Sequence, residues 1–228
     1  YGASLPAGVD ADAPPRWVQV ADGHEYAWHD HRIHFMSPQM PQGVDPTSGD
    51  VQSVFDWEIP TVVDGRQVAI TGSLDWVPSR GPGVPVAAGL VGIALLVAGR
   101  RRLHAAVTVG AGALTALAVS VPMVTGLPTG ADADLALVAL PGAGAVLAVV
   151  GSRWSDGHRA RLVQAAAAVP LLVWVGLLVG SLTRPIVPGP VPTWAVQVAV
   201  VVVALLGVAT VVGALRDATP TASGGSAP

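Results

Sequence analysis

The chain has 228 residues, of which 51% are hydrophobic and only 12% are charged, and its formal net charge at pH 7 is −3. Soluble globular domains carry roughly 25% charged residues, so this composition predicts a membrane protein. The sequence has no cysteine, which excludes disulfides, thiolate metal sites and cysteine nucleophiles. No basic cluster is interleaved with aromatic residues, so nucleic acid is not an expected partner.

The stretch "WHDHRIHFM", residues 28–36, concentrates three of the six histidines of the chain. In a strand His29 and His31 share a face, whereas in a helix His31 and His34 share one. Imidazole and thioether ligands together suit copper. We therefore expect one copper ion to be bound through His29 and His31, which can point the same way from a strand, assisted by His34, His24 or a methionine from Met36 and Met40.

The same stretch also fits a structural role. Histidines beside Asp30 and Arg32 are typical of a hydrogen-bond network, with the two charged residues forming an ion pair and Trp28 and Phe35 in a core. No serine has the context of a nucleophile elbow, and no glycine-rich phosphate loop precedes a helix. We therefore do not expect catalytic activity from this chain alone.

Residues 1–80 are expected to form an antiparallel, sandwich-like β-domain. In "VQSVFDWEI" the residues alternate between two faces, as in a half-buried strand, and one face is formed by Val51, Ser53, Phe55, Trp57 and Ile59. Asp64-Gly65 then stands between two apolar runs, which is a strong hairpin signal.

Residues 81–216 are expected to form a bundle of five transmembrane helices. Each of the five apolar runs is near the ~20 residues needed to cross the ~30 Å hydrocarbon layer, although the first and third are short. Small residues four apart, such as Ala88 with Gly92 and Ala106 with Gly110, favour close helix contacts. The five runs are Val84–Gly99, His104–Val124, Leu135–Val150, Leu162–Leu182 and Pro192–Leu215.

The distribution of arginine predicts the orientation, because cytoplasmic loops are enriched in Lys and Arg. The first and third links carry three arginines each and Arg216 follows the last helix, whereas the alternate links contain only Arg184. The N-terminal domain is thus expected outside the cytoplasm, and residues 217–228 form a disordered cytoplasmic tail. An exported domain needs a signal, and the segment that begins at Tyr1 has none, so we expect a longer precursor.

Three segments carry a family resemblance: "YAWHDHRIHFMSPQMP", "FDWEIPTVVDG" and "VAITGSLDWVP". From about residue 15 to residue 78 the chain resembles a family of actinobacterial membrane proteins that have no assigned activity. That resemblance implies an exported β-domain with a WHDHR-x-H-aromatic-Met motif, followed by transmembrane helices. It also implies additional exported sequence upstream of this motif.

The leading functional hypothesis is a non-catalytic cell-membrane protein whose exported domain binds copper. Its partners would be membrane lipid and other membrane subunits, for example those of a copper-dependent membrane monooxygenase. A purely structural or interaction subunit is the first alternative, and a copper importer is the second. An importer needs metal ligands along its helices, and Met123 alone hardly meets that need. No charged residue falls within the helical runs, which disfavours pumps, channels and secondary transporters.

Overall fold

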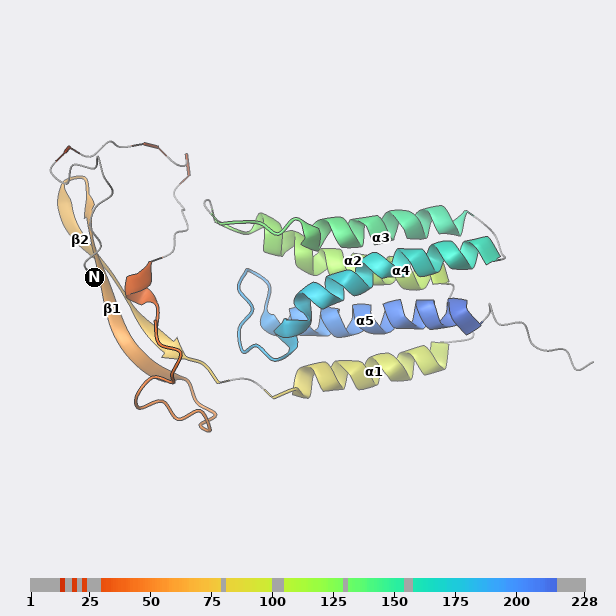
Figure 1. Ribbon diagram of the computed structural model, residues 1–228, viewed down its shortest axis with the longest axis horizontal. Coiled ribbons are helices and arrows are strands. Elements are labelled where there is room, and N and C mark those ends of the chain that lie inside the picture. The colour runs from red at the N-terminus through yellow and green to blue at the C-terminus, as the bar shows by residue number, and fades with distance from the viewer. Residues whose placement is uncertain are drawn as a thin grey trace, which may run out of the picture.

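The computed structural model describes residues 13–14, 18–19, 22–23, 30–78, 81–99, 105–128, 131–153 and 158–216. A β-hairpin lies beyond one end of a set of five helices (Figure 1). Two of the predicted metal ligands, His24 and His29, lie outside the described residues, and so does the tail expected at 217–228.

The hairpin consists of strands β1 (Gln52–Val63) and β2 (Arg66–Trp76), which pair in antiparallel fashion. Asp64 and Gly65 connect them, with φ angles of 50° and 74°. Two consecutive residues with positive φ are what a type I′ turn requires, and its twist matches that of the flanking strands. The predicted hairpin turn is confirmed.

An irregularity in the ladder changes the face on which the first residues of β1 lie. Ser53 pairs with Asp75 and Phe55 pairs with Leu74, so Val54 has no partner of its own and forms a bulge. Beyond it, Phe55, Trp57 and Ile59 share the more buried face, as predicted. Before it the alternation is reversed, so the prediction is wrong for the start of the strand.

The expected sandwich is not formed by the described part of the chain, because its sheet contains two strands. The apolar face of the hairpin is covered incompletely. Ile59 is 6% exposed, whereas its cross-strand partner Ile70 is 41% exposed. Around the middle of the hairpin the indole of Trp57 lies over Gly72, where an added Cβ would be 2.3 Å from the ring. Gly72 thus provides the space that this aromatic side chain occupies.

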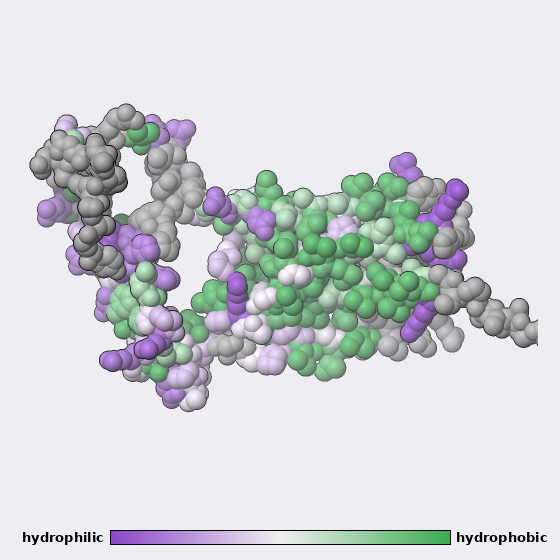
Figure 2. All heavy atoms as spheres, viewed as in Figure 1, coloured by the Kyte–Doolittle hydropathy of each residue, from purple (hydrophilic) through white to green (hydrophobic). Residues whose placement is uncertain are grey.

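The five helices begin and end close to the predicted residues. They are α1 (Gly83–Gly99), α2 (Ala105–Thr125), α3 (Ala136–Ser152), α4 (His158–Leu178, continued by the 3₁₀ turn η2, Val179–Leu182) and α5 (Thr193–Arg216). Three segments are long and apolar enough to span a membrane: Ala105–Thr125, Arg159–Leu182 and Thr193–Arg216. By length, α1 and α3 are short apolar helices of 17 residues, about 25 Å at ~1.5 Å per residue. The space-filling view in Figure 2 shows an apolar band over the helices and polar residues at both ends of the helix bundle.

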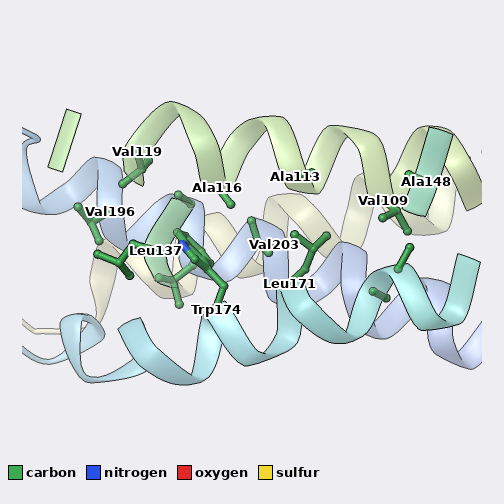
Figure 3. Packing of buried hydrophobic residues seen from close by; sticks show 14 of the residues in the cluster. Val109, Ala113, Ala116, Val119, Leu137, Ala148, Leu171, Trp174, Val196 and Val203 are labelled. Carbon is green, nitrogen blue, oxygen red and sulfur yellow. The ribbon is translucent and has the colours of Figure 1, made fainter. Parts of the chain in front are cut away.

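Helices α2 to α5 share one core. Leu171 and Trp174 project from α4 into the space between helices, where Ala116 of α2 and Val203 of α5 also point (Figure 3). By contrast α1 lies along α5, where Gly92 receives the side chain of Leu205. Among the described residues an added Cβ at Gly110 would meet nothing within 4 Å, so the close contact expected there is not formed in the described part of the bundle.

Polar side chains in the bundle link neighbouring helices. The Trp174 indole donates a hydrogen bond to Ser120 Oγ over 2.8 Å, and both side chains are fully buried. Gln164 donates to the carbonyl of Ala148, and Gln197 donates to the carbonyl of Ser181. The two glutamines therefore act as interhelical contacts in the described bundle.

Candidate metal site

The motif begins with a short 3₁₀ turn that Asp30 caps. This turn, η1, spans His31–Ile33, and Asp30 Oδ1 accepts a hydrogen bond from the backbone N–H of Arg32 over 2.9 Å. The Arg32 guanidinium donates two hydrogen bonds to the same carboxylate, from Nε to Oδ1 over 2.9 Å and from Nη2 to Oδ2 over 2.5 Å. These bonds with Asp30 raise the pKa of Arg32 above its ordinary value. The predicted Asp30–Arg32 ion pair is confirmed.

The turn places two imidazoles on one side of the chain. Residues three apart eclipse each other in a 3₁₀ helix, so His31 and His34 lie on the same face. At His34 the backbone becomes extended, with φ −115° and ψ 133°. Side chains two apart in extended backbone point to the same side, which brings Met36 next to His34.

Both imidazoles approach the same sulfur atom. His31 Nδ1 lies 3.3 Å from Met36 Sδ, and His34 Nδ1 lies 3.2 Å from it. Two nitrogens and one thioether sulfur thus converge from within six consecutive residues. Without a metal the sulfur can accept a hydrogen bond from the N–H group of each ring.

The N···S distances also fit ligands that share one metal ion. With metal–nitrogen and metal–sulfur bonds of about 2.0 and 2.3 Å, separations of 3.2–3.3 Å correspond to a ligand–metal–ligand angle of about 95–100°. That angle lies between square and tetrahedral geometry, so a small opening of the cluster accommodates either. The donor set, two imidazoles and a thioether, is soft enough for Cu(I).

The cluster is accessible from solvent while the backbone that carries it is anchored. Met36 is 57% exposed, and both histidines are exposed. Ile33 and Phe35 are half-buried, and η1 packs against β1. We did not predict that Ile33 would anchor the turn. Ile33 is an apolar residue between the polar residues Arg32 and His34, and this position could have indicated that its side chain is half-buried.

The structure thus brings together three of the six predicted ligands. The strand expected through this stretch is not found at residues 31–33, which form a 3₁₀ turn, so His31 shares a face with His34. His29, the expected partner of His31, lies outside the described residues. Met40 is 49% exposed, and within the described part of the chain its sulfur makes no polar contact with the cluster. The described residues hold no group of three His, Cys, Asp or Glu side chains that could bind a metal, and the candidate third donor beside His31 and His34 is the Met36 thioether.

The comparisons with known proteins give no further assignment. No family model matches the chain, and no curated protein or solved structure is significantly similar to it.

Met123, considered above for an importer, packs against the buried core of the bundle.

Proposed function

We propose that this chain is a multi-pass membrane protein with five spans, an extracytoplasmic hairpin domain and a cytoplasmic C-terminus. Three helices of sufficient length support the membrane assignment, and α1 and α3 are at the lower limit of about 17 residues for a span. Arg153, Arg159 and Arg216 stand at helix ends that lie together, opposite the hairpin (Figure 1). Positive charge collects on the cytoplasmic side, which supports the proposed orientation.

Single cysteines test this topology, because the chain has no cysteine of its own. Ser53 and Ser152 are both exposed and lie at opposite ends of the molecule. A membrane-impermeant maleimide added to intact cells should label Ser53→Cys, and it should label Ser152→Cys only after permeabilisation. Labelling of Ser152→Cys from outside contradicts the orientation.

The hairpin domain is proposed to bind one copper ion as Cu(I) through His31, His34 and Met36. The convergence of two imidazole nitrogens on one thioether sulfur carries this proposal. Its surface location suits a protein that passes metal on, since a partner can reach an exposed ligand. We propose the role of a non-catalytic accessory subunit that supplies copper to a larger membrane complex, such as a copper-dependent membrane monooxygenase.

A structural role is the second candidate. The Asp30–Arg32 pair already closes the turn, and Asp30 has only 10% of its side chain exposed. In that case the imidazole–sulfur contacts only fasten the loop, and the motif serves as an interaction surface for another membrane subunit.

Competition with a Cu(I)-specific chelator on the purified chain in detergent separates these two functions. We expect one Cu(I) per chain, with binding abolished in His31→Ala/His34→Ala and retained in Met40→Leu, the matched control. Because protons compete with the metal for the imidazole nitrogens, binding should weaken as the pH is lowered. An absence of stoichiometric Cu(I), or equal binding by the double variant, leaves the structural role as the better account.

A further inference from the structure

Met36 supplies the soft donor of the described cluster, and it is also open to small oxidants. Its side chain is 57% exposed while its sulfur contacts both imidazoles. A thioether that is exposed in this way is a substrate for peroxide. A metal bound through one sulfur lone pair draws electron density from the sulfur and covers it, so bound metal slows the attack of this sulfur on the oxidant.

We propose that Met36 is a redox-controlled ligand: peroxide oxidises it when the site is empty and thereby closes the site to Cu(I), whereas bound metal protects it. This inference rests on the proposed copper function. In the reaction a sulfur lone pair attacks one oxygen of hydrogen peroxide and the O–O bond breaks. That oxygen stays on sulfur and its proton passes to the other oxygen, which leaves as water, so sulfur loses two electrons and peroxide gains them.

The product changes the chemistry at the centre of the cluster. Methionine sulfoxide is polar, and its oxygen accepts hydrogen bonds strongly. The N–H groups of His31 and His34 then bind this oxygen, where the unmodified sulfur faced their Nδ1 atoms at 3.2–3.3 Å. Loss of the soft donor and occupation of both rings remove the preference of the site for Cu(I). Methionine sulfoxide reductases reverse the reaction, so the control is reversible.

The other two methionines provide internal controls. Met40 is 49% exposed, close to the value for Met36, yet among the described residues its sulfur makes no polar contact with the cluster. Met123 packs against the core of the bundle. Peroxide should therefore reach Met36 and Met40 in the empty protein, and only Met36 should respond to the presence of metal.

Silver(I) is the appropriate probe, because it shares the charge and softness of Cu(I) and does not produce radicals with peroxide. The full-length protein in detergent is treated with hydrogen peroxide with or without one equivalent of silver(I), and sulfoxide at each methionine is quantified by peptide mass spectrometry. The affinity of the oxidised Met40→Leu variant for Cu(I) is then measured by chelator competition. Met36→Leu, which cannot form the sulfoxide, serves as the control for oxidation elsewhere.

We expect silver(I) to reduce oxidation of Met36 at least about tenfold and to leave Met40 unchanged. Oxidation of Met40→Leu should weaken Cu(I) binding at least about tenfold, the lower end of the effect of losing even an outer-shell partner of a metal. The weaker affinity of Met36→Leu should not respond to peroxide. Unchanged Cu(I) affinity after complete oxidation of Met36, or equal protection of Met36 and Met40, overturns the inference. If the unoxidised chain binds neither ion, the proposed function itself fails.

Discussion

Ser120→Ala removes the hydroxyl that accepts the indole N–H of Trp174 inside the helix bundle. The two atoms are 2.8 Å apart and both residues are 0% exposed, so neither water nor lipid headgroups reach the indole nitrogen after the change. An unsatisfied buried donor costs about 1–3 kcal/mol in soluble proteins. Interhelical hydrogen bonds in membranes average about 0.6 kcal/mol and reach about 1.7, because the unfolded chain in the membrane finds other partners. We expect Ser120→Ala to lower the free energy of unfolding by about 1 kcal/mol.

A double-mutant cycle with Trp174→Phe isolates the hydrogen bond from the change in packing. Unfolding in mixed detergent–dodecyl sulfate micelles, followed by helical circular dichroism, provides the free energies. Thr115→Val is the matched control, since the Thr115 hydroxyl bonds only back to the Ala111 carbonyl of its own helix. A coupling energy below about 0.3 kcal/mol, the usual error of additivity, would refute the reasoning.

Two further predictions concern a helix contact and a loop. Gly92→Leu should destabilise the protein by about 1–3 kcal/mol through overpacking, because a Cβ at Gly92 would lie 2.5 Å from Leu205 Cδ1. Gly110→Leu, with nothing within 4 Å of the added Cβ, should leave thermal stability in detergent unchanged, and an equal loss in both variants contradicts the packing. Hydrogen bonds from the Thr47 side chain and then its backbone N–H lower the pKa of Asp45, so Thr47→Val should raise that pKa in an NMR titration. The wild-type bonds stabilise the loop above the unfolded pKa of ~3.9 and are lost as the pH falls through the lowered value; an unchanged pKa in the variant counts against this cause.

The helices were predictable because a membrane span has a simple physical requirement. An uninterrupted apolar run sets the length of the helix, and turn residues or charges end it. The Asp64-Gly65 turn was equally predictable, since few residue pairs adopt two successive positive φ angles. Both features depend on local sequence alone.

Features that depend on pairing were not predictable in the same way. The bulge at Val54 arises where β1 meets β2, and nothing in "QSVF" marks it. The sandwich required a second sheet, which alternation along one strand cannot reveal. Likewise the spacing of Gly110 from Ala106 suggested a contact, but its direction depends on how α2 is rotated towards its neighbours.

At the candidate metal site the possible ligands could be chosen from the sequence, but the strand assumed for this stretch favoured His29 and His31 as the leading pair. The choice between His29–His31 and His31–His34 depended on whether the backbone was extended or helical. Asp30 held the relevant signal, because an aspartate that accepts the N–H two residues later caps a turn. Given that cap, the helical alternative places His31 and His34 together, and the extended residues after them bring in Met36.

The site and the hairpin depend on each other, because a two-stranded hairpin alone is marginally stable in water. Packing of η1 against β1, with Ile33 and Phe35 half-buried, adds apolar contacts that the two strands lack. The same packing fixes the turn from which His31 and His34 project. A ligand that binds only the folded form stabilises it by about 2.7 kcal/mol at a concentration 100 times its Kd. Under the proposed function, metal bound at His31, His34 and Met36 would therefore stabilise the hairpin domain through η1.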